Sequence, residues 1–302
     1  MRPLDIGVYA PAGAVTDPAG VARGVERLAA LGHRVVLDEG VLRRHTRFAG
    51  TDDERLAAIE RIARRDDVDV AIALRGGYGT TRLLARLDYG SLSRSGKRWL
   101  GHSDFTAFQL AALARTGMIT YAGPAFAYDF GGTEASAFTL RHCFGLLEAR
   151  EYEVRCTLDG PARLDARGVL WGGNLAMVAS LAGTPYLPQV DGGILFLEDV
   201  GEHPYRVERM FHQLAYAGVL GRQRAVLLGH FTEYALAPHD DGYDLPGAVA
   251  QLRALTPVPV FTGLPFGHVR DKLTLPVGGR LALAVRDGDA RLSFHDYAAD
   301  DR

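Results

Sequence analysis

The sequence predicts an α/β protein, in which a parallel sheet covered by helices is followed by a smaller, β-rich α+β domain. Two observations predict this class. Up to about residue 150, short apolar runs alternate with helix-like segments, which is typical of βαβ units. Beyond that point most apolar runs are short and β-like. With 302 residues the chain is long enough for one large domain or two ordinary ones.

The first part contains clear start and stop signals for its helices. Thr51 is a candidate N-cap, and Glu54 stands three residues later as its capping-box partner. Gly32 closes the preceding amphipathic segment. We therefore expect strands within 6–13, 33–39, 69–74 and 98–101, and helices over 21–32, 51–67, 80–88 and 105–116.

The second part has a different rhythm. Residues 151–167 are polar with scattered Gly and Pro, which favours a linker between a domain over 1–150 and a domain over 168–302. In the latter we expect β-like runs at 168–174, 192–201, 224–231, 259–268, 273–279 and 280–285, and helices at 175–183, 205–218 and 247–255.

Composition excludes several classes of protein. A formal net charge of -2 and a pI near 6.6 give no field that would hold nucleic acid or an anionic membrane surface. The two cysteines, Cys143 and Cys156, form no CxxC pair and no metal cluster with neighbouring histidines, so we expect reduced thiols. No run has the length of a membrane span and no signal peptide is evident, so we expect a cytoplasmic protein.

Ligands of open parallel sheets bind beyond the carboxyl ends of the strands, and Ser103 lies at such an end. It follows the apolar Trp99-Leu100 and precedes an apolar helix. One interpretation is a helix N-cap, and the other is a nucleophile pushed out of the sheet beside free backbone amides. The GxSxG signature of α/β-hydrolases is missing, because Phe105 stands where its last glycine would be.

Two further strand ends carry candidate residues. The glycine-rich turn that begins at Arg75, RGGYGTT, can bring backbone amides near an anion, although most such turns are only turns. Glu198 follows four apolar residues, and is either the first exposed residue past the core or the held partner of a base. His268 lies in a Gly-bounded loop, where it could take a proton from Ser103 and donate to Glu198. His102 could line the same pocket.

Five segments, taken in order, resemble the LD-carboxypeptidases, also called muramoyltetrapeptide carboxypeptidases. They are RGGYGTTRLL, GHSDFTAF, LWGGNLAMVASLAGTPY, ILFLEDVGEHPYRVERM and TGLPFGHVRDKLTLPVG. The resemblance covers nearly the whole chain from VYAPAG onward.

The resemblance implies a site and a function. It implies a catalytic triad of Ser103, Glu198 and His268, and an oxyanion hole from the backbone amides of Asp104 and Gly77. It also implies two domains with the site between them and suggests a homodimer. We expect no cofactor and no metal. The implied substrate is the cytoplasmic murein tetrapeptide, whose terminal D-alanine is removed during cell-wall recycling.

The substrate contacts stay open at this point. Arg75, Arg82, Arg206 or helix-start amides could bind the terminal carboxylate. Trp171 and Asn174 could line the cleft, but a core tryptophan and a helix cap are equally compatible with their positions.

Three other functions compete with this interpretation. A microcin-immunity peptidase of the same family would cleave a peptidyl-nucleotide, and its site would offer an aromatic platform to the base. A non-catalytic protein could hold a small anionic ligand on the glycine turn. A metallopeptidase is disfavoured because no HExxH or comparable ligand cluster occurs.

Overall fold

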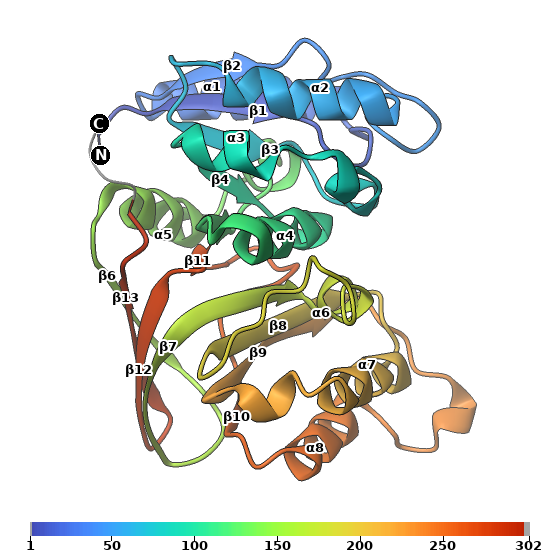
Figure 1. Cartoon of the computed structure of the whole chain (residues 1–302). Helices are drawn as coiled ribbons and strands as arrows, with labels where there is room; N and C mark the ends of the chain where they lie inside the picture. The colour runs from blue at the N-terminus through green and yellow to red at the C-terminus, as the bar shows by residue number, and fades with distance from the viewer. Residues whose placement is uncertain (1, 299–302) are drawn as a thin grey trace.

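The computed structural model describes residues 2–298 and contains two sheets, one in the upper and one in the lower half of the view in Figure 1. The sheet of the first part is six-stranded, and the sheet of the second part is seven-stranded. Helices pack against both. The predicted α/β class is confirmed.

The first sheet is parallel except at one edge. Its order is β11-β5-β4-β3-β1-β2, and β11 alone of these strands runs antiparallel to its neighbour. Its strands are β1 (Asp5–Tyr9), β2 (Arg34–Leu37), β3 (Val70–Ala73), β4 (Arg98–Gly101), β5 (Thr120–Ala122) and β11 (Leu275–Val277). The α-helices of this part are α1 (Pro18–Ala30), α2 (Asp52–Ala63), α3 (Tyr89–Arg94), α4 (Thr106–Thr116) and α5 (Ala137–Glu148). The 3₁₀ helices η1 (Thr80–Arg86) and η2 (Ser103–Phe105) and the π-helix η3 (Phe126–Phe130) accompany them.

Local signals explain where these helices begin and end. The predicted capping box is confirmed, because Thr51 Oγ1 accepts from the Glu54 amide while Glu54 accepts from the Thr51 amide. Gly32 follows α1 with a φ of 88°, a conformation that glycine adopts without strain. The helix expected over 80–88 is wrong in type: residues 80–86 form a 3₁₀ helix, η1, because the chain must turn again at Asp88 to start α3.

The second sheet is mixed. Its order is β10-β9-β8-β7-β12-β13-β6; the four strands from β10 to β7 are parallel, and the remaining neighbours pair antiparallel. Its strands are β6 (Tyr152–Thr157), β7 (Arg163–Asn174), β8 (Ile194–Val200), β9 (Ala225–Thr232), β10 (Val260–Thr262), β12 (Arg280–Arg286) and β13 (Asp289–His295). The helices are α6 (Leu175–Ser180), α7 (Pro204–Tyr216) and α8 (Leu245–Leu255), with the turns η4 (Leu220–Arg222) and η5 (Pro238–Asp240). The range 151–167, expected to be a linker, holds β6 and the start of β7, whose exposed faces make the stretch polar.

Strand β11 crosses back into the first sheet. The sequence assigns 273–279 to the second domain, but Leu275, Pro276 and Val277 pair with β5 of the first. A three-residue apolar strand carries no signal of its partner, so this crossing could not be predicted. The chain therefore passes between the two halves more than once.

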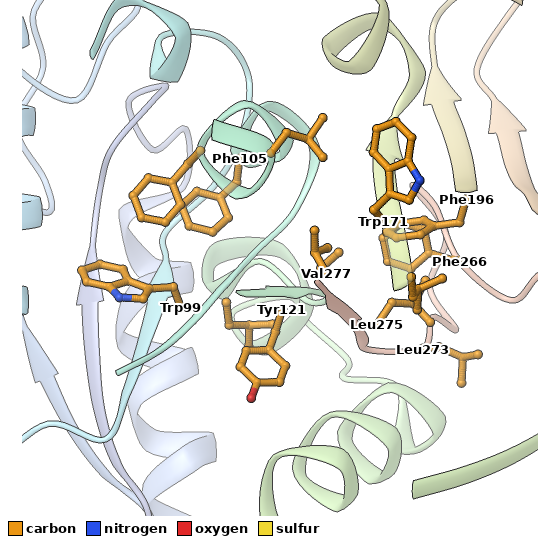
Figure 2. Close-up of a cluster of buried hydrophobic side chains, with 14 of the residues drawn as sticks. Trp99, Phe105, Tyr121, Trp171, Phe196, Phe266, Leu273, Leu275 and Val277 are labelled. Carbon is orange, nitrogen blue, oxygen red and sulfur yellow. The ribbon is translucent and has the colours of Figure 1, made fainter. Parts of the chain in front are cut away.

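An apolar core joins the two halves. Helix α4 is buried on nearly all sides and contacts both β7 and β11, as expected for a helix that is hydrophobic around its circumference. Figure 2 shows Trp99, Phe105 and Tyr121 on one side of β11, and Trp171, Phe196 and Phe266 on the other. All six side chains are 2% exposed or less. The halves share one hydrophobic core.

Two smaller expectations concern membranes and thiols. Among the helices of residues 2–298, none is long and apolar enough to cross a membrane. Cys143 and Cys156 are free thiols. Burial raises the pKa of Cys143 to about 12 and that of Cys156 to about 11, so both resist ionisation.

Shortening the side chain of Leu275 on strand β11 tests whether this strand holds the two halves together. Leu275 is 1% exposed, and we expect Leu275→Ala to lower the free energy of unfolding by roughly 2–5 kcal/mol through lost burial and a cavity. Leu42→Ala is the control, because Leu42 is 54% exposed and its truncation should change stability by about 0.5 kcal/mol or less. Urea unfolding measures both. Equal effects of the two substitutions would contradict a shared core at β11.

Candidate active site

Ser103 stands on a strained corner at the carboxyl end of β4. His102 is extended, and Ser103, with a φ of 64°, is the first residue of η2, which leads directly into α4. A non-glycine residue with positive φ is uncommon, and such strain clusters at functional sites. Ser103 makes no capping hydrogen bond, since the caps of η2 and α4 are His102 and Phe105. The capping interpretation is therefore wrong.

The glycine-rich turn lies directly against this serine. A Cβ built on Gly76 would come within 2.7 Å of Ser103 Cβ and 3.0 Å of its Oγ. The amide nitrogen of Asp104 would lie 3.1 Å from the same position. Only a residue without a side chain fits here, and Gly77 follows with a φ of 103°. The turn thus presents its backbone to the serine corner.

The side chain of Asp104 links the corner at Ser103 to the glycine-rich turn through a hydrogen bond. It is 2% exposed, and its Oδ2 accepts a hydrogen bond of 2.9 Å from the amide of Thr80, just beyond the glycines. Burial raises the pKa of this carboxyl group. Sequence reasoning considered only the backbone of Asp104; an acidic residue between a serine and an apolar helix was the available signal.

Glu198 and His268 form a buried pair. His268 Nδ1 lies 2.7 Å from Glu198 Oε2; the Glu198 side chain is fully buried and that of His268 is 22% exposed. The pairing of β8 with β9 is irregular here: Leu197 faces Leu228 and Asp199 faces Phe231, so Glu198 faces two residues of β9. A carboxylate on one nitrogen of an imidazole fixes the ring and leaves the other nitrogen for chemistry.

Glycines let the His268 loop approach this carboxylate. A Cβ at Gly229 of β9 would lie 2.3 Å from the carbonyl oxygen of Phe266. One at Gly267, whose φ is 136°, would lie 3.3 Å from Glu198 Oε2. Side chains at these positions would push the histidine away from the glutamate.

Asn174, the only asparagine of the chain, connects the Glu198–His268 pair to helix α4, which follows Ser103. Its Nδ2 donates to Asp199 Oδ1 at 2.7 Å and lies 3.4 Å from Glu198 Oε1. Its backbone amide donates to Thr106 Oγ1, on the first turn of α4. Burial, with Glu198 as a smaller cause, raises the pKa of Asp199 to about 6.

Residues from both halves line one cavity of about 540 Å³. Ser103, His102 and the glycine turn line it from the first half, and His268 and Lys272 line it from the second. Lys272 forms a buried ion pair of 2.7 Å with Asp129, which neither strand pattern nor motif indicated. The full lining is Arg75, Gly76, Gly77, His102, Ser103, Ala125, Tyr128, Asp129, Val200, Glu233, His268, Val269, Arg270 and Lys272.

Of the residues that could contact substrate, not all line the cavity. The first two are the arginines of the glycine-rich turn region, Arg75 and Arg82. Arg75 lines the cavity, where its guanidinium lies 5.4 Å from the ring centre of Tyr128 and donates to the Ala14 carbonyl. Arg82 pairs with Asp52 and does not line the cavity.

The remaining candidates also lie outside the cavity lining. Arg206 pairs with Glu202. Trp171 is a core residue, 1% exposed, whose Nε1 donates to Gln223. Asn174 is buried and caps α6. Both residues thus occupy the alternative positions, a core tryptophan and a helix cap, and neither belongs to the cavity lining.

Comparison with known proteins identifies the family. The family model of the LD-carboxypeptidase N-terminal domain matches residues 6–123, and that of the LD-carboxypeptidase C-terminal domain matches residues 167–283. The chain belongs to the LD-carboxypeptidase family. It is a serine carboxypeptidase.

Three relatives illustrate the family's range. A crystal structure of muramoyltetrapeptide carboxypeptidase from Oxalobacter formigenes is 46% identical, with a TM-score of 0.91 over 97% of this chain and 99% of that one. Murein tetrapeptide carboxypeptidase of Pseudomonas aeruginosa is 32% identical and covers 92% of each chain. The microcin C7 self-immunity protein of Escherichia coli is 27% identical over 86% of this chain and 84% of its own.

Adding a methyl group at Gly76 tests the contact between the glycine-rich turn and Ser103. Because the added Cβ would meet Ser103 Cβ at 2.7 Å, we expect Gly76→Ala to lower the carboxypeptidase kcat by about 10²-fold through displacement of the serine. Gly221→Ala is the control, since no heavy atom lies within 4 Å of the Cβ it adds. Steady-state kinetics compares them; full activity in Gly76→Ala would show that the turn does not position the serine.

Asn174 is expected to position Glu198 without touching substrate. Asn174→Ala removes the donor that lies between two buried carboxyl groups, so we expect kcat to fall by about 10-fold or more while KM changes little. Asn174→Gln, which keeps the amide, should retain more activity. The exposed Gln251→Ala is the control for loss of an amide. A rise in KM with unchanged kcat would assign Asn174 to substrate binding instead.

Proposed function

We propose that this enzyme removes the terminal D-alanine from murein tetrapeptide, with Ser103 as nucleophile, His268 as general base and Glu198 as the group that orients it. The observation that carries the proposal is the 2.7 Å contact between His268 Nδ1 and Glu198, on a cavity that Ser103 also lines. The relatives named for murein tetrapeptide hydrolysis support the choice of substrate.

The proposed reaction proceeds through an acyl-enzyme. With its proton on Nδ1, held by Glu198, His268 accepts the Ser103 proton on Nε2 as Oγ attacks the carbonyl carbon before D-alanine. The C–N bond then breaks, and His268 returns the proton to the leaving amine. Water attacks the acyl carbon, gives a proton to His268, and releases the tripeptide while that proton returns to Ser103.

We assign the oxyanion hole to the backbone amides of Asp104 and Gly77. Both residues belong to the two corners that Asp104 and Thr80 hold together. Donors fixed in this way stabilise charge that develops only in the tetrahedral transition state. Fixing them before substrate arrives avoids reorganisation during the reaction.

The substrate's free carboxylate needs a cation, and we propose Arg75. Its guanidinium lines the cavity next to the glycine turn, and the structure gives it no carboxylate partner among the described residues. Planar guanidinium groups bind carboxylates with two parallel hydrogen bonds. Lys272, by contrast, is already paired with Asp129.

The microcin-immunity relative favours a second candidate substrate, a peptidyl-nucleotide. Tyr128 lines the cavity and is 52% exposed, so it offers an aromatic face to a base. The same triad would cleave the amide bond.

The proposal includes a cellular setting. We infer that the enzyme acts as a homodimer in the cytoplasm, on peptides recycled from the cell wall. Sedimentation of the purified protein measures its oligomeric state.

Release of D-alanine from murein tetrapeptide, followed by mass spectrometry, tests the triad. We expect Ser103→Ala and His268→Ala to lower kcat by about 10⁴-fold or more, and Glu198→Gln by a comparable factor, because the histidine loses its orientation. Ser93→Ala, at an exposed serine of α3, should retain full activity.

Two outcomes separate the candidate substrates. Turnover of a peptidyl-nucleotide, with murein tetrapeptide left intact, would favour the microcin-type activity. Unchanged D-alanine release by folded Ser103→Ala, with folding checked by circular dichroism, would refute the assignment of the nucleophile.

A further inference from the structure

His102 is a buried histidine that the proposed reaction does not use. It is 5% exposed and lines the cavity beside Ser103. Neither ring nitrogen makes a hydrogen bond of acceptable geometry within the described residues, although the backbone of Gly267 lies near enough to influence the ring. A buried polar group without a good partner is costly, so its retention calls for an explanation.

The ring of His102 faces the proposed base. The ring centres of His102 and His268 lie 4.5 Å apart. One potential ligand atom from each of His102, His268 and Glu198 can be chosen so that all three lie within 4.8 Å of one another. In a tetrahedral zinc site with bonds of about 2.0–2.1 Å, neighbouring ligand atoms stand roughly 3.3 Å apart, so the separations must change by about 1.5 Å or less.

The protonation of His102 suits a metal ligand. Burial lowers its pKa well below the usual value, and the nearby charges of Lys272 and His268 lower it further. A neutral imidazole keeps a lone pair available for a metal. Glu198 supplies the negative charge that a buried divalent cation requires.

We propose that His102, His268 and Glu198 form an inhibitory binding site for a divalent transition-metal ion of the zinc class. Two nitrogens and one carboxylate oxygen are a ligand set that suits zinc, and the cavity beside Ser103 provides both the path of entry and room for a bound water as fourth ligand.

Binding would block the base whichever nitrogen of His268 takes the ion. A metal on Nε2 occupies the lone pair that would accept the serine proton. A metal on Nδ1 displaces the ring proton to Nε2, which then cannot accept another. The inhibitory part of this proposal therefore rests on the proposed function, whereas metal binding itself does not.

The test uses the full chain after treatment with a chelator. Zinc is titrated by calorimetry, cobalt(II) by its visible absorption, and D-alanine release is measured at each zinc concentration. We expect binding of one ion per chain, a cobalt spectrum of the intense tetrahedral type, and inhibition that a chelator reverses. The chelator alone should not reduce activity.

The matched variants are His102→Phe and His45→Phe. The first keeps an aromatic ring against His268 but removes both nitrogens, so the metal affinity should fall at least about 10-fold, and the inhibition constant, measured against the variant's own metal-free rate, should rise by the same factor. His45 is exposed, and its replacement should change neither value.

Several outcomes would overturn the proposal. These are absence of binding up to about 1 mM metal, equal affinity in His102→Phe and the unsubstituted chain, and stoichiometric binding without inhibition. If the chain releases no D-alanine at all, the proposed function fails, while calorimetry and the cobalt spectrum still decide whether the site exists.

Discussion

The buried carboxylate of Glu198 is the constraint on which the site depends. Its side chain has no exposed surface, so its charge must be satisfied from within the protein. The bulge of β9 lies opposite it, Gly229 and Gly267 leave space for the His268 loop, and Asn174 approaches from β7. A buried charge with good partners has one stable arrangement, and that arrangement fixes the histidine.

The same polar network sets the distance between the two halves. Through one residue, Asn174, the acidic pair of β8 is joined to Thr106 on the helix that follows Ser103. On the other side of the serine, Asp104 joins the corner to the glycine turn. Combined with the apolar core in Figure 2, these contacts hold residues from both sheets around one cavity.

The sequence predicted those features that follow from local pattern. The apolar runs located the strands, so Ser103 could be placed at a strand end, and the capping box of α2 could be read directly. The left-handed conformation of Ser103 could not be predicted, because serine has no preference for it and its close contact with Gly76, from another strand end, forms only in the folded chain. His268 and Glu198 are 70 residues apart, and no periodicity indicates such a pairing. The Gly-bounded loop made His268 a candidate among ten histidines, and the family resemblance implied the same pair.

The return of the chain to the first sheet at β11 has a consequence for synthesis. Residues 275–277 complete a sheet whose other strands end at residue 122, so the edge of β5 lacks its partner until most of the chain has left the ribosome. Pairing over such a separation carries a large loop-closure entropy and slows folding. The nascent first half therefore emerges with an open strand edge, a template for wrong pairing that only the nearly finished polypeptide can cover.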